Sequence, residues 1–138
     1  MNAKQYLKQA YRLNELIESN QEELSALRES ASSIPGIDYS KDKIQSSKSS
    51  GDAEFVNVVA KIIEIEDSIN DDINKLFALK LQIRTVINAV ENPDERLLLH
   101  DRYINFYTWE QVCEKMNVSL RTAHRIHSTA LSNVKIPS

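Results

Sequence analysis

Apolar side chains recur at steps of four and three residues through most of the first ninety positions, and this spacing is the strongest constraint on the fold. Residues spaced in this way share one face of an α-helix, and a sustained repeat is typical of coiled coils. The sequence therefore predicts one helix of about 27 residues and a second from Ala53 to Val90. The first series is Tyr6, Ala10, Leu13, Ile17, Leu24 and Leu27, and polar Asn20 occupies one position of the repeat. The second is Phe55, Val59, Ile62, Ile69, Ile73, Leu76, Ile83, Ile87 and Val90, interrupted by Glu66 and Lys80.

Glycine and proline are scarce, with two Gly and three Pro among 138 residues. This scarcity disfavours a turn-rich β fold and favours long helices, so we expect an all-α fold. Pro35, Gly36 and clustered serines mark a loop at about 31–52, and Asp52 is a candidate cap for the second helix. The simplest arrangement is a long antiparallel coiled-coil helical hairpin over residues 1–91. Self-association through the same apolar faces remains open.

A different organisation begins at residue 92. The dipeptide Asn92-Pro93 ends the long helix, because a residue that precedes proline is pushed away from helical dihedral angles. Pro93 suits the first turn of a new helix, and the two acids that follow it suit the positive end of the helix dipole. We expect three short helices, at about 93–105, 108–116 and 119–134, in a domain that spans residues 92–138.

The last two of these helices have the signature of a helix-turn-helix. Thr108 and Gln111 have the spacing of a capping box at the start of the first helix. Asn117 suits the left-handed conformation of a tight turn, and Ser119 is a strong N-cap for the next helix. Ala123, Ile126, Ala130 and Leu131 are expected to face the core.

The charge distribution points to the same segment. The chain has a net charge of −3, and residues 1–92 carry 15 acids and 11 bases, whereas residues 117–138 contain no acid. A basic helix of a helix-turn-helix enters the major groove, where Arg suits guanine or phosphate. We expect His127 at the surface or at the edge of the core. The candidate DNA-binding residues are Thr108, Ser119, Leu120, Arg121, Thr122, His124, Arg125 and Ser128.

The segment from about 93 to 135 resembles region 4 of bacterial sigma factors, which recognises the promoter −35 element. The resemblance rests on Glu95–Tyr103, Thr108–Val112, Asn117-Val118-Ser119 and Ala130-Leu131. The resemblance implies that Leu120, Arg121, His124 and Arg125 contact bases. Leu120 departs from the usual polar or basic residue and is suited to a thymine methyl group. Asp101 departs from the apolar residue that sigma factors often carry there.

The full chain is similar to small phage and prophage proteins of Gram-positive bacteria, grouped with ArpU-like and RinA-like late-transcription regulators. This resemblance implies a sequence-specific transcription regulator that binds promoter double-stranded DNA and activates late genes with host RNA polymerase, in the cytoplasm of a bacterial host cell. The N-terminal hairpin is then either a structural spacer, or a platform for RNA polymerase or for a second copy of the chain. Two alternatives are a DNA-packaging protein like the phage small terminase, and an RNA polymerase-binding adaptor without DNA readout.

Other classes of function have little support in the sequence. No nucleophile–base constellation, glycine-rich phosphate loop or metal-ligand spacing is present, so we expect no enzyme and no catalytic residue, metal or cofactor. No apolar run approaches the length of a membrane span, so we expect no membrane partner.

Overall fold

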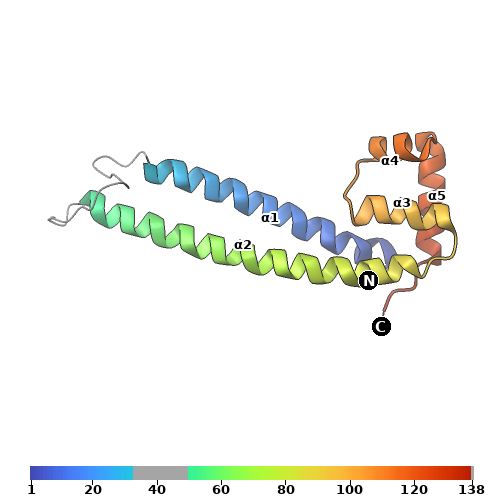
Figure 1. Cartoon of the computed structure of the whole chain (residues 1–138), viewed down its shortest axis with the longest axis horizontal. Helices are drawn as coiled ribbons and strands as arrows, with labels where there is room; N and C mark the ends of the chain where they lie inside the picture. Colours follow the sequence, from blue (N-terminus) through green and yellow to red (C-terminus); the bar gives the residue numbers. More distant parts are fainter. Residues whose placement is uncertain (33–49, 138) are drawn as a thin grey trace. The chain divides into compact units, whose positions relative to one another are not determined.

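The computed structural model describes residues 1–32 and 50–137, and every regular element in them is a helix. The five helices are α1 (Ala3–Ser32), α2 (Ser50–Asn88), α3 (Pro93–Tyr103), α4 (Trp109–Met116) and α5 (Leu120–Asn133) (Figure 1). The predicted all-α class is therefore confirmed. None of the described helices combines the length and the apolar character that crossing a membrane requires.

The predicted boundaries differ from the structure by a few residues. α2 begins at Ser50, so the predicted cap Asp52 falls within the helix and not before it, and most of the predicted loop lies outside the described residues. α3 ends at Tyr103, and the N–H of Asn105 then donates to the carbonyl of His100, five residues back, where a continued α-helix would use the carbonyl of Asp101. Phe106 then takes a left-handed φ of 57°, which an aromatic residue adopts only where its surroundings hold it.

Contacts between residues divide the chain into two compact units. The five-helix unit consists of Met1–Glu15 and Asn74–Ser138, and it contains the start of α1, the end of α2 and the three short helices. The two-helix unit consists of Leu16–Ile73. The predicted functional boundary between residues 91 and 92 stays a prediction.

In the two-helix unit, α1 and α2 bury Ile17 and Leu24 of the first predicted series and Ile69 of the second. Ala31 and Ile65, which lie outside both series, are buried with them. The structure also explains one interruption of the second series. Glu66 accepts a hydrogen bond from Arg28 of α1, with Nη2 and Oε2 2.6 Å apart. Both side chains are more than a third exposed, so the pair adds at most about 1 kcal/mol to stability.

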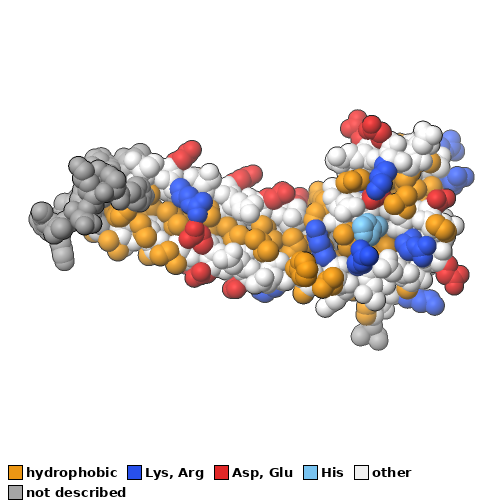
Figure 2. Space-filling model, viewed as in Figure 1, with side chains coloured by type: hydrophobic (Ala, Val, Ile, Leu, Met, Phe, Trp, Pro, Cys, Tyr) orange, Lys and Arg blue, Asp and Glu red, His pale blue; other side chains and the backbone are white. Residues whose placement is uncertain are grey.

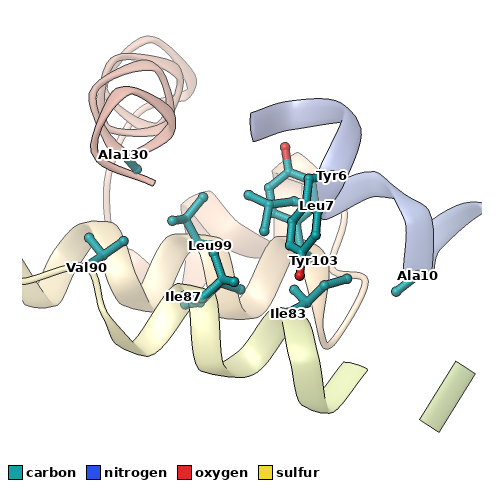
Figure 3. Packing of buried hydrophobic residues seen from close by; sticks show 10 residues of the cluster. Tyr6, Leu7, Ala10, Ile83, Ile87, Val90, Leu99, Tyr103 and Ala130 are labelled. Atoms are coloured by element: carbon teal, nitrogen blue, oxygen red, sulfur yellow. The ribbon is translucent and has the colours of Figure 1, made fainter. Parts of the chain in front are cut away.

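The core of the five-helix unit draws on segments that lie far apart in the sequence. Leu7 of α1, Ile87 of α2 and Leu99 of α3 are all fully buried. Figure 3 shows how side chains from both long helices pack against α3 and α5. The buried residues of this cluster are Tyr6, Leu7, Ala10, Ile83, Val86, Ile87, Val90, Leu99, Tyr103 and Ala130. The first turns of α1 are therefore part of the support of α5.

A second cluster packs the three short helices against one another. Leu98 of α3, Val112 of α4 and Ala123 of α5 have no exposed surface. Half-buried Trp109, Met116 and Ile126 are among the side chains that pack around them. Ala123 and Ala130, two of the residues expected to face the core, are buried, and Ile126 and Leu131 pack against the clusters as expected.

Asp101, which departs from the sigma-factor pattern, is completely buried and joins α3 to α4. Its Oδ1 accepts hydrogen bonds from Lys115 Nζ at 3.0 Å and from Asn105 Nδ2 at 3.1 Å. The hydrogen bond to Asp101 is the main reason why the pKa of Lys115 is raised. The pairing with Lys115 offsets part of the cost of burying this carboxylate, although Oδ2 has no hydrogen-bond partner among the described residues.

His127 joins α5 to α3 by a buried hydrogen bond, and it lies deeper than the predicted surface or core edge, with 8% of its surface exposed. Its Nε2 lies 2.7 Å from the hydroxyl of Tyr103. Burial lowers the pKa of His127 to about 4, and the nearby charges of Lys4, Arg102 and His124 act in the same direction. Burial also raises the pKa of Tyr103 to about 12, although Arg102 opposes this shift. The pair is therefore held as two neutral partners.

Leu7→Ala should lower the free energy of unfolding by about 2–5 kcal/mol, because it opens a cavity in a core shared with α3 and α5. Leu81→Ala is the matched control, since Leu81 is 54% exposed and belongs to the same unit. We expect that control to change stability by less than about 1 kcal/mol. Urea unfolding of both variants measures the difference, and equal losses would show that α1 does not support the short helices.

Stability should fall as the pH is lowered from about 7 to 5, because unfolded His127 takes up a proton that the folded chain excludes. With a pKa of about 4 in the folded chain against 6.5 when unfolded, the loss is about 2 kcal/mol. Urea unfolding at both pH values should show that His127→Gln removes this part of the pH dependence. Tyr103→Phe should keep it, because burial is the main cause of the shift. If His127→Gln loses as much stability between pH 7 and pH 5 as the wild type does, this assignment is wrong.

Candidate nucleic-acid interface

The start of α4 is capped as the sequence predicts. The hydroxyl of Thr108 accepts a hydrogen bond from the Gln111 N–H at 3.2 Å, and the Thr108 N–H donates to Gln111 Oε1 at 2.8 Å. The capping box is therefore confirmed, and it satisfies two N–H groups that the helix itself leaves without partners.

The turn between α4 and α5 also follows the prediction. Asn117 takes the left-handed conformation, with φ 56° and ψ 48°. The N–H of Val118 donates to the carbonyl of Cys113 at 3.0 Å, which closes the end of α4. Ser119 is the N-cap of α5, because its hydroxyl accepts from the Thr122 N–H at 3.2 Å. These caps fix where α5 begins and which of its side chains face outward.

One side of α5 is turned to solvent from Leu120 to Ser128. We call it the outer face of α5, and it consists of Leu120, Arg121, His124, Arg125 and Ser128, all exposed. These residues occupy neighbouring positions on the helix surface, opposite the buried Ala123 and Ala130. The structure thus brings five of the predicted site residues together on one surface with two arginines and no acid.

The three remaining site residues serve the helix caps. Thr108 and Ser119 are exposed, but the hydroxyl of each accepts a capping hydrogen bond. Thr122 is half-buried, and its hydroxyl accepts from the Ser119 hydroxyl at 3.0 Å. Their evident task in this structure is to hold α4 and α5 in place.

His124 is held against a ring, which sequence reasoning did not anticipate. Its imidazole centroid lies 4.3 Å from that of Trp109 of α4. The guanidinium of Arg102 lies 4.7 Å from the Trp109 ring, a cation–π contact. The outer face of α5 therefore borders a group of side chains in contact around the Trp109 ring, and His124 is one of them. Trp109 also packs against the cluster of the short helices, and its position in the sequence gives no signal of the contact with His124.

The two units differ sharply in charge. The five-helix unit contains 12 Lys and Arg against seven Asp and Glu, a net charge of +5. The two-helix unit contains five against 13, a net charge of −8. Figure 2 shows blue side chains gathered over the short helices, whereas red ones predominate over the two-helix unit. Sequence reasoning placed positive charge only at the C-terminal end, because it could not assign the basic start of α1 to the same unit.

Asn117→Ala should lower the free energy of unfolding by about 1–2 kcal/mol, because a residue with a Cβ and no helpful side chain strains the left-handed conformation. Asn117→Gly is the matched comparison and should be nearly neutral, since glycine adopts positive φ without a steric penalty. Thermal and urea unfolding give the two values. If the Ala and Gly variants were equally stable, the left-handed turn would not matter for stability.

Comparison with known proteins gives one family. No curated protein and no solved structure matches the chain. A family model described as "Protein of unknown function (DUF1492)" matches residues 33–135, which include all of α2, α3, α4 and α5. Because the match covers well over half of the sequence, the chain belongs to the DUF1492 family.

Proposed function

We propose that the protein is a sequence-specific regulator of transcription that binds double-stranded DNA through the outer face of α5. The observation that carries this proposal is that face itself. It is exposed, contains two arginines and no acid, and is presented by a capped turn in a unit with a net charge of +5. A helix presented in this way has the shape and charge to enter the major groove.

Each residue of the outer face has a role in this proposal. Arg121 and Arg125 lie one helical turn apart and can bind guanine edges or phosphates. Leu120 is 54% exposed at the start of the helix and can contact a thymine methyl group. His124, held against Trp109, offers a ring nitrogen in a restricted position.

The finer architecture belongs to the same proposal. We propose that α3–α5 form a helix-turn-helix domain like region 4 of sigma factors, and that α1 and α2 form an antiparallel coiled-coil hairpin. Because the reading face is short, a single copy of the chain would have a low affinity for DNA. We therefore propose that the hairpin supplies a second contact, either to host RNA polymerase or to a second copy of the chain. Apolar side chains that the two-helix unit leaves exposed support such a contact, namely Leu16, Val56, Ile63 and Ile73.

The proposed setting follows from the resemblance to late-transcription regulators. The protein would act in the cytoplasm of a bacterial host, at phage or prophage promoters, and activate late genes. No step of this function requires catalysis, a metal or a cofactor.

The double variant Arg121→Ala/Arg125→Ala should lose sequence-specific DNA binding. Each good base contact is worth roughly 1–3 kcal/mol, so we expect the dissociation constant to rise by roughly tenfold or more. A binding site is first obtained by selection from a random DNA library, and affinity is then measured by fluorescence anisotropy. Lys75→Ala/Arg84→Ala is the control, because it removes two exposed positive charges of α2 from the same unit.

If Arg121→Ala/Arg125→Ala binds the selected site as tightly as the wild type, the outer face of α5 is not the reading surface. If the wild type binds no DNA even at low salt, where phosphate contacts are strongest, the proposal of a DNA-binding protein is wrong.

A further inference from the structure

The first turns of α1 carry a row of positive charges on one side. Lys4, Lys8 and Arg12 are spaced four residues apart, so they follow one another along the same face of the helix. We call this the basic face of α1. It points away from Tyr6, Leu7 and Ala10, which the same turns bury in the core. Lys4 and Arg12 are exposed, and Lys8 is half-buried.

This row of charges belongs to the unit that carries α5. Leu7 and Ala10 share one apolar cluster with Ala130, and Leu131 and Val134 pack against that cluster. Lys4 also lies close enough to His127 of α5 for its charge to lower the pKa of that imidazole. The basic face of α1 therefore begins beside α5, although more than a hundred residues separate the two in the sequence.

Two of these three charges have no counter-charge within the described part of the chain. Arg12 pairs with Glu15, with 3.0 Å between Nη1 and Oε1. Among the residues that the structure describes, no carboxylate forms an ion pair with Lys4 or Lys8. Aligned, unpaired ammonium groups on a unit with a net charge of +5 attract a polyanion.

We propose that the basic face of α1 is a second DNA-binding surface, which contacts backbone phosphates beside the site read by α5. This proposal rests on the proposed function, because it assigns the phosphates to the same duplex. Lysine suits this task, since its compact charge binds phosphate without reading bases. DNA is favoured over an acidic protein because the basic face of α1 shares its core with the proposed reading helix.

Two surfaces that bind one duplex in different ways have separable effects. The outer face of α5 should determine which sequence is bound, whereas the basic face of α1 should raise the affinity for every sequence. Loss of a phosphate contact also reduces the number of counterions that binding releases, by about one for each lysine. The salt dependence of binding is therefore the specific signature of this surface.

The test compares Lys4→Gln/Lys8→Gln with the wild-type chain and with Lys75→Gln/Arg84→Gln. Glutamine removes the charge and keeps good helix propensity, and circular dichroism checks that each variant folds. Anisotropy at several salt concentrations gives the affinities for the selected site and for random DNA. We expect Lys4→Gln/Lys8→Gln to bind both roughly tenfold more weakly, with a slope of log K against log salt smaller by about 2. The Lys75→Gln/Arg84→Gln control should change neither value as strongly.

Shortened duplexes give a second readout. Base pairs are removed stepwise from each end of the selected site. On the side that contacts α1, trimming should weaken the wild type to the level of Lys4→Gln/Lys8→Gln and should leave that variant unaffected. If trimming weakens both proteins equally, the lysines do not contact the flanking phosphates and the proposal is wrong.

Two further outcomes separate this proposal from the proposed function. If Lys4→Gln/Lys8→Gln binds like the wild type while Arg121→Ala/Arg125→Ala binds weakly, the second surface is refuted and the function of α5 stands. If the wild type binds no DNA at low salt, both are refuted. If Lys4→Gln/Lys8→Gln keeps full DNA affinity but loses binding to purified RNA polymerase, the basic face of α1 serves a protein partner and the proposal is wrong.

Discussion

The shared core of the five-helix unit is the constraint on which the rest of the structure depends. The three short helices bury only a small cluster among themselves, around Leu98, Val112 and Ala123. A unit of that size gains little stability from its own apolar burial. Leu7 of α1 and Ile83 and Ile87 of α2 add fully buried side chains that close the core over α3 and α5. The first and last parts of the chain therefore stabilise one another.

Two polar pairs, each with at least one buried member, help to fix the arrangement of this core. Apolar packing alone tolerates small rotations of one helix on another, whereas a buried polar group must find its partner. Asp101 holds Lys115 of α4, and His127 of α5 holds Tyr103 of α3. Both pairs include a residue of α3, so α4 and α5 are each tied to the same helix. The His127–Tyr103 pair therefore acts with the helix caps to fix which side of α5 faces outward.

The two units that the contacts define also differ in net charge. A net charge of −3 over the whole chain conceals units of +5 and −8. In the proposed function, a duplex would be attracted to the first unit and repelled by the second, which would separate the proposed DNA-binding surface from the proposed partner-binding surface. The two-helix unit, which carries the exposed apolar residues proposed for a partner, is the acidic one, so a partner bound there would not compete with DNA.

Local features of this protein are determined by the sequence alone. The capping box at Thr108, the left-handed Asn117 and the Ser119 cap follow from side chains within three residues of each helix end, so their chemistry is complete in the sequence. The two long helices follow from apolar periodicity, which is also local. Tertiary structure decided the rest, because contacts across many residues leave no periodic signal. Only the fold placed Lys4 beside α5, buried His127 against Tyr103 and paired Asp101 with Lys115.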